Sequence, residues 1–412
     1  MKTLSIDLAA HDLYRAGFPY AVFAELRRES PVWWHPTTPT RRTPSGVDFW
    51  VVLGQPELQE ASRDWSRFSS IEGSSLTKTP GERSGHTLVA SDPPAHTRLR
   101  KLVNAGFTPR MIAKLDDLVE QRTTEVLDAA AERNDCDLVQ DIALQLPLHI
   151  IADIVGIPEA DRVEVFRMID LVTRVADPAQ GYAAADGLAA ERWVFDYAER
   201  LGEEKRRRPA DDVWSILAVA EIEDDDGNRT RLSPLELDMF FLILAIAGSE
   251  TTRNVTSGGL LALLDHPDQM DAVRRDPARL PAAVEEMIRW VSPVVCFART
   301  ATVDLELGGQ PIRAGDRVTL WFPAANRDER VFTDPDRFDT TRTPNPHVAF
   351  GGGGMHFCLG SHLARRELRV MFGQLLTRFP DVAVTGPVSY LVGAPEQTVA
   401  VSLDRVPVRL AP

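Results

Sequence analysis

Cysteine is scarce in this chain of 412 residues, in which only Cys136, Cys296 and Cys358 occur. Such a sparse and odd set excludes the disulfide framework of a small secreted domain and fits a reducing compartment. Positive charge is also in deficit, with 46 Lys and Arg against 60 Asp and Glu and a formal net charge of -14. Nucleic acids and anionic membranes attract basic surfaces, so this balance disfavours general binding to either.

Long apolar runs are missing as well. The longest, residues 239–247, falls far short of the ~20 residues that a membrane-spanning helix needs. Residues 1–20 mix Asp7, Asp12 and Arg15 with apolar side chains and have no signal-peptide core. We therefore expect a cytoplasmic protein without a membrane anchor. The 44% of hydrophobic residues suffice for a large core.

The hydrophobic pattern predicts a mainly α fold with a small β subdomain. Apolar residues recur at spacings of three and four, the period of amphipathic helices, over much of residues 92–208. A stretch rich in Gly, Ser and Thr at residues 69–90 has no clear period and is expected to be a long surface loop. Helices are also expected at residues 280–290 and 359–379, and strands near residues 32–35, 49–53 and 398–403. Residues 300–322 are expected to form a β-hairpin region with a turn at Gly308-Gly309.

A long helix is expected to begin at Ser233. Ser233 can cap it, Pro234 suits the first helical position and Glu236 completes a capping box. The next strong stop is at residues 265–267, so the helix would span roughly 45 Å at ~1.5 Å per residue and cross a whole domain. We expect it to be the central helix.

Polar residues interrupt this helix at residues 248–252, directly after the apolar residues 239–247. One explanation is that the hydroxyls and the carboxylate bond to neighbouring backbone groups, as buried polar groups usually do. The other is a catalytic kink that lines a cavity. The pattern of the helix by itself leaves both open.

The most informative segment is residues 350–360, Phe-Gly-Gly-Gly-Gly-Met-His-Phe-Cys-Leu-Gly. Four glycines let the backbone approach a flat and large group, and backbone amides at the helix start beside Cys358 would stabilise a thiolate. The glycine spacing does not match a phosphate-binding loop. Zinc binding through His356, Cys358 and His362 would lack a second cysteine pair. A buried structural cysteine is a further alternative.

Four motifs in order resemble the cytochrome P-450 superfamily over nearly the whole chain. Besides the cysteine loop, residues 247–252 resemble its oxygen-activation stretch, residues 286–289 its Glu-x-x-Arg motif, and residues 334–338 its meander, with Arg337 as the arginine. The resemblance implies one domain, residues 1–412, with the family's triangular-prism shape and a long central helix over a haem.

The cysteine loop departs from the commonest family pattern in one respect. Phe350 lies eight residues before Cys358 rather than seven, because the glycine run holds one extra residue. The longer loop, with Asn345-Pro346-His347 before it, resembles the bacterial subgroup that oxidises steroid side chains and methyl-branched lipids.

The resemblance implies haem b as the cofactor, with Cys358 as the iron ligand that favours O–O cleavage. Glu250 and Thr251 would be the catalytic pair that delivers protons. Glu286, Arg289 and Arg337 would form a buried structural charge network. Groups expected to contact the haem, some of them at its propionates, are His96, Arg100, Ala247, Gly248, Arg299, Phe350, Gly351, His356 and Gly360. A lone His or Arg is otherwise usually a solvated surface group.

The resemblance also implies a largely apolar substrate pocket. We expect it to accept a terpenoid, a steroid, a fatty acyl chain or a polyketide, although core packing alone would give the same composition. The pocket would draw on residues 69–90 and 168–190 and on Ile243, Ile246, Ala247, Val294, Val295, Phe297, Leu391 and Val392.

Electrons would have to come from other proteins, because three cysteines cannot hold a four-cysteine cluster as well as the haem ligand. The resemblance implies a ferredoxin with an NAD(P)H-dependent ferredoxin reductase. A basic patch could bind the ferredoxin, although an ordinary solvated face is the alternative. Its candidate residues are Arg98, Arg100, Lys101, Arg365 and Arg366.

The expected function is that of a monooxygenase that inserts one atom of O2 into a hydrophobic substrate. Two alternatives are a peroxide-driven haem-thiolate peroxygenase and a non-catalytic haem protein, such as an electron carrier or a gas sensor. The Glu250 and Thr251 pair argues against the peroxygenase, which has less need of a proton relay.

Haem ligation by Cys358 can be tested by spectroscopy. The dithionite-reduced protein with carbon monoxide is expected to have a strongly red-shifted Soret band, which Cys358→Ser removes because the thiolate ligand is lost. A band that is unshifted and survives the substitution would return Cys358 to a structural role.

Overall fold

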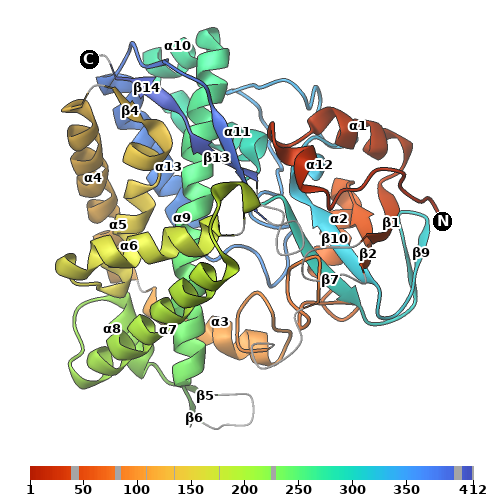
Figure 1. Ribbon diagram of the computed structural model, residues 1–412, viewed down its shortest axis with the longest axis horizontal. Coiled ribbons are helices and arrows are strands. Elements are labelled where there is room, and N and C mark those ends of the chain that lie inside the picture. Colours follow the sequence, from red (N-terminus) through yellow and green to blue (C-terminus); the bar gives the residue numbers. More distant parts are fainter. Residues whose placement is uncertain are drawn as a thin grey trace.

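The computed structural model describes residues 1–38, 46–78, 85–107, 109–133, 135–175, 177–223, 229–393 and 401–410. The long helix α9 (Pro234–Asp265) runs through the molecule, with helices on one side and a mixed sheet on the other (Figure 1). The expected mainly α fold with a small β region is confirmed.

Most of the helices gather around α9. Within the helical part they are α3 (Ala95–Gly106), α4 (Pro109–Ala131), α5 (Gln145–Val155), α6 (Glu159–Arg174), α7 (Ala184–Arg207), α8 (Val213–Val219), α10 (Pro267–Arg275), α11 (Leu280–Val291) and α13 (Ser361–Arg378). Helices α1 (Tyr20–Glu29), α2 (Gln55–Arg63) and α12 (Phe322–Ala325) accompany the sheet.

Helix α9 begins where the sequence predicts. Ser233 Oγ accepts a hydrogen bond from the Glu236 N–H at 3.2 Å, and the Glu236 carboxylate accepts one from the Ser233 N–H at 2.8 Å. Arg98 of α3 donates to the same carboxylate at 2.7 Å. The helix then packs against α5, α7, α11 and α13, so its apolar side chains are buried on several sides.

The main sheet has the strand order β1-β2-β10-β7-β3, and only β10 and β2 are parallel. Side chains of β2 alternate between two buried faces: Phe49 and Val51 pack in one apolar cluster, Trp50 and Val52 in another. The strands are β1 (Val32–Thr38), β2 (Val47–Val52), β3 (Phe68–Ser69), β7 (Cys296–Ala301) and β10 (Arg317–Trp321).

Smaller sheets complete the β part. The expected turn at Gly308-Gly309 joins β8 (Leu305–Leu307) to β9 (Gln310–Ile312). The strand expected at residues 398–403 is observed as β13 (Val401–Arg405), while residues 398–400 lie outside the described residues, as do residues 79–84 of the expected long loop. The other short strands are β4 (Asp135–Asp137), β5 (Ile222–Glu223), β6 (Arg229–Thr230), β11 (Ala383–Val384), β12 (Ser389–Val392) and β14 (Pro407–Arg409).

One helical segment, Leu138–Val155, is apolar and long enough to cross a membrane by length and composition. It comprises a π-helical turn and α5, and 72% of it is buried inside the protein. Since α5 packs against α4 and α9, the segment is accounted for as part of the core.

A buried charge network joins α11 to the irregular meander that follows β10. Glu286 and Arg289 are completely buried and share two hydrogen bonds of 2.8 Å. The Arg342 guanidinium donates to Glu286 at 3.1 Å. The prediction for Arg337 is wrong in this respect: only its carbonyl accepts from Arg289, and its side chain is exposed. The long side chain of Arg342, which lies farther along the meander, reaches the buried Glu286 carboxylate in place of Arg337.

The Arg342→Ala variant is therefore expected to lose about 3 kcal/mol of unfolding free energy, because a buried carboxylate loses one of its cationic partners. Arg337→Ala is the matched control and is expected to stay within about 0.5 kcal/mol of the parent protein. Urea unfolding followed by circular dichroism measures both. An Arg337→Ala loss as large as that of Arg342→Ala would contradict the assignment.

Candidate active site

Cys358 lies between the glycine run and the start of α13. Cys358 is an exposed residue, although the protein around it partly desolvates its thiol. This desolvation raises the pKa of the Cys358 thiol, whereas the backbone N–H groups of Gly360 and Ser361 and the charges of Arg100 and Arg365 lower it. An accessible sulphur with these partners is suited to metal ligation as a thiolate.

Phe350 fixes the other end of the cysteine loop. The Cys358 N–H donates to the Phe350 carbonyl at 2.9 Å, which closes the loop despite its extra residue. The Arg365 guanidinium lies 4.4 Å from the centroid of the Phe350 ring and donates to Glu285 at 2.7 Å. The phenyl ring and the loop are thus fixed against α13 and α11.

The glycine run has a different use from the one expected. A Cβ at Gly352 would lie 2.6 Å from Ser62 Oγ, and one at Gly354 would lie 2.9 Å from the Ser62 carbonyl oxygen. Gly352 and Gly354 therefore permit close packing of α2, whereas a Cβ at Gly351 would meet only ordinary contacts of 3.8 Å and one at Gly360 would meet open space. The prediction that all four glycines approach a flat ligand is therefore wrong, because Gly352 and Gly354 face α2 instead.

Two imidazoles and two guanidiniums converge beside this loop. The rings of His96 and His356 lie 4.5 Å apart, and Arg100 donates to the Phe357 carbonyl at 3.1 Å. Burial lowers the pKa of Arg299 to about 10. Burial and the neighbouring Arg299 and His96 lower the pKa of His356 to about 3. In the described part of the chain, Arg299 forms no ion pair and His96 Nε2 is buried without a partner.

This cluster fits an anionic cofactor. One buried and one half-buried imidazole, together with two guanidiniums, would bind carboxylates strongly, and an unpartnered buried nitrogen is costly unless a ligand satisfies it. The two propionates of a haem supply such carboxylates, next to a cysteine that can ligate its iron. The predicted residues His96, Arg100, Arg299, His356 and Cys358 are therefore brought together.

The middle of α9 has one open face. Ala247 is exposed, although most of the helix is buried, and the Thr251 hydroxyl donates to the Ala247 carbonyl at 2.8 Å. The Ser249 hydroxyl donates to the Ala245 carbonyl in the same way. The helix is continuous, so the hydroxyls bond to the backbone and the face at Ala247 is nevertheless open. The first explanation is thus confirmed for these hydroxyls, the expected kink is absent from the continuous helix, and a catalytic use of the open face stays a prediction.

Gly248 lies on another side of α9. A Cβ there would come within 2.8 Å of Ile151 Cδ1, so the glycine permits close packing of α5. Its expected contact with the haem stays a prediction.

The predicted substrate pocket divides into two groups. Val295 and Val392 are 2% and 0% exposed and lie in an apolar cluster with Cys296 and Trp321. Leu391, which precedes Val392 in β12, is also buried. These positions belong to the core in this conformation, because such side chains leave no surface for a ligand. The predicted residues that are only half-buried are Ile243, Ile246, Val294 and Phe297.

The predicted basic patch is weaker than expected. Arg98 pairs with Glu236 at 2.7 Å, Arg365 with Glu285 at 2.7 Å, and Arg366 with Asp116 at 3.1 Å. Three of the five expected charges are thus offset by carboxylates, which the linear sequence did not place near them.

Sequence reasoning also missed polar partners of the site. Ser70 Oγ lies 3.1 Å from His356 Nε2, and the Asp92 carboxylate accepts from the Ser70 N–H at 2.9 Å. Arg63 of α2 donates to the Gly352 carbonyl at 3.1 Å. No local pattern marks these residues, since each acts across a long sequence separation.

Comparisons with known proteins agree with this site. A family model described as Cytochrome P450 matches residues 44–383. The chain is 39% identical to a steroid C26-monooxygenase of Rhodococcus jostii over 92% of this chain and 80% of that protein. It is 40% identical to a methyl-branched lipid omega-hydroxylase of Mycobacterium tuberculosis over 88% and 85% of the two chains.

A solved structure gives the same result. The Mycobacterium marinum cytochrome P450 in complex with pseudoionone has a TM-score of 0.88 and 38% identity, with 99% of each chain covered. The resemblance and its nearness to the steroid and methyl-branched lipid subgroup are confirmed. Members of this family bind haem b through a cysteine thiolate. The chain therefore belongs to the cytochrome P450 family and is a haem-dependent monooxygenase.

Proposed function

We propose that this enzyme hydroxylates a branched apolar chain, such as a steroid side chain or a methyl-branched lipid. The observation that supports this proposal is the accessible Cys358 beside the buried side chains of His96 and Arg299 and the half-buried His356. In this proposal Cys358 ligates the haem iron, and the cluster, with Arg100, holds the propionates. The haem, once bound through a thiolate, supplies the activation of O2 for insertion into a C–H bond.

The substrate class rests on two considerations. Both relatives with named substrates act on apolar molecules, a steroid in one case and a methyl-branched lipid in the other. The half-buried side chains Ile243, Ile246, Val294 and Phe297 offer apolar surface and would favour a ligand of the same character.

Glu250 and Thr251 are proposed to deliver protons. The Thr251 hydroxyl donates its proton to the Ala247 carbonyl, so its oxygen lone pairs are available to accept another hydrogen bond on the open face of α9. Glu250, one residue earlier, is about one-fifth exposed and can exchange protons with the surroundings. The pair would bring protons from outside to the face that carries Ala247.

A ferredoxin with its NAD(P)H-dependent reductase is proposed as the electron source, in the cytoplasm. Because Arg98, Arg365 and Arg366 are paired, the docking charge would come instead from Arg63 and Arg100 beside the cysteine loop. An acidic partner would suit these groups, although the enzyme is acidic overall.

The substrate proposal can be tested with purified holoenzyme, NADPH and a surrogate ferredoxin system. A steroid with a branched side chain or a methyl-branched fatty acid is expected to shift the haem spin state and to gain one hydroxyl group. A straight-chain fatty acid of equal length is the control and is expected to bind more weakly. Turnover of neither branched compound, or only with added peroxide, would contradict the proposal.

The Thr251→Ala variant is expected to continue to consume NADPH while hydroxylated product per NADPH falls about tenfold or more, because proton delivery fails. Ser257→Ala is the matched control, since its hydroxyl likewise donates to a carbonyl four residues earlier on α9, at 2.9 Å. Unchanged product yield in Thr251→Ala would remove Thr251 from the relay.

A further inference from the structure

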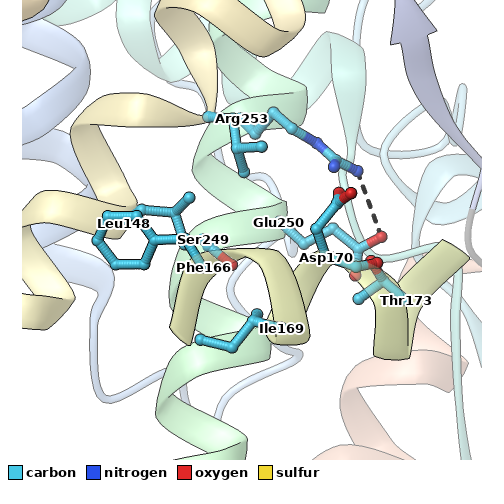
Figure 2. A pocket seen from close by; sticks show the side chains of 9 residues that line it. Leu148, Phe166, Ile169, Asp170, Thr173, Ser249, Glu250 and Arg253 are labelled. Carbon is cyan, nitrogen blue, oxygen red and sulfur yellow. Dashed lines mark hydrogen bonds and ion pairs between the residues drawn. The ribbon is translucent and has the colours of Figure 1, made fainter. Parts of the chain in front are cut away.

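A small cavity lies between α5, α6 and α9, next to the polar residues of the central helix. Its volume is about 10 Å³, which is enough for about one water molecule. Asp170 and Thr173 of α6 line it on one side, and Ser249, Glu250 and Arg253 of α9 on the other (Figure 2). The remaining walls are apolar side chains of α5 and α6.

The unsatisfied side chain of Arg253 favours a water molecule in the cavity. The side chain of Arg253 is 3% exposed, and its Nη2 lies 3.4 Å from the Glu250 carboxylate. Its Nε is buried and has no partner among the described residues. A buried donor of this kind is costly to leave unsatisfied, and one water in the adjoining cavity would satisfy it.

Asp170 connects the cavity to solvent. Its side chain is 28% exposed, and one carboxylate oxygen accepts from Arg174 Nε at 2.7 Å. Arg174 is itself fixed, because it also donates to Asp404 at 2.9 Å. Asp170 therefore has a fixed position from which it can contact bulk water outside and the cavity inside.

We propose that Asp170 takes up protons from solvent and that one water in this cavity passes them to Glu250. The inference rests on the proposed function of Glu250 and Thr251 and extends it outward. In each transfer an O–H bond of protonated Asp170 breaks, the water accepts that proton, and the water gives one of its own protons to the Glu250 carboxylate. Solvent then protonates Asp170 again. Arg253 is a positioning residue that holds the water and Glu250.

The contribution of Asp170 could instead be structural, through its pair with Arg174. Two variants separate these roles. Glu164→Gln removes another carboxylate of α6 that is paired with an arginine, since Arg167 donates to Glu164 at 2.7 Å. Glu164 does not line the cavity. Asp404→Asn removes the negative charge of the other partner of Arg174, as Asp170→Asn does for the first, and leaves Asp170 intact.

The test measures hydroxylated product per NADPH and the solvent deuterium isotope effect on turnover in the holoenzyme. Asp170→Asn keeps the size and an acceptor for Arg174 but cannot carry a proton; it is expected to lower product per NADPH about three- to tenfold and to raise the isotope effect. Asp170→Glu should recover most of the yield. Glu164→Gln and Asp404→Asn should behave like the parent enzyme, and the carbon monoxide spectrum reports that the haem site is intact.

The outcomes also separate this inference from the proposed function. If Glu250→Gln lowers the product yield but Asp170→Asn does not, Asp170 is not the uptake residue and the inner relay stands. If Glu250→Gln leaves the yield unchanged, the relay itself fails. An Asp404→Asn loss equal to that of Asp170→Asn would overturn the proposal in favour of the structural role.

A high-resolution crystal structure of the parent protein gives an independent answer, whether or not the variants fold. An ordered water within hydrogen-bond distance of Arg253 Nε and a carboxylate oxygen of Glu250 or Asp170 is expected. A dry cavity would overturn the proposal.

Discussion

Packing around α9 is the constraint on which the rest of this structure depends. The helix lies against α5, α7, α11 and α13, so each of its faces has a different neighbour. Gly248 permits close contact with Ile151 of α5, whereas the adjacent face of the helix, which carries Ala247 and Thr251, is more open. A single helix can therefore pack in the core on one face and line a reaction space on another, because successive residues of a helix point toward different neighbouring elements.

Two buried groups of charges differ in how they are neutralised. Around Glu286, a carboxylate, two guanidiniums and several backbone groups satisfy one another, so the network is complete within the chain. Around Arg299, a second guanidinium and two imidazoles lie together without a carboxylate paired to Arg299, and His96 Nε2 has no partner among the described residues. A low-dielectric interior tolerates charge only with a counter-charge. The first group therefore stabilises the fold, and the second requires a bound anion.

The cysteine loop combines both kinds of constraint. Its glycines allow α2 to pack against it through Ser62, and Arg63 and Arg365 hold it from outside. The exposed Cys358 sulphur lies at the end of this supported loop, so the side chain that would ligate iron stands on a rigid base.

Much of this could be predicted from local sequence. The cap at Ser233, the length of α9, the strand pattern at residues 49–53 and the glycine run before Cys358 follow from spacing and side-chain chemistry, which act over a few residues. The order of the motifs was enough to indicate the family, and hence the haem and the convergence of His96, Arg299 and His356.

Only the tertiary structure decided which side chains meet across long separations. It replaced the Arg337 side chain by that of Arg342, placed Val295 and Val392 in the core, and paired Arg98 with Glu236. It also brought Asp170 and Glu250 to one cavity, eighty residues apart in the chain. Such contacts depend on how helices pack and on how far each side chain reaches. The sequence pattern predicts neither the helix packing nor the side-chain contacts across it. The period of one helix determines which residues share a face, but not which neighbouring element that face contacts.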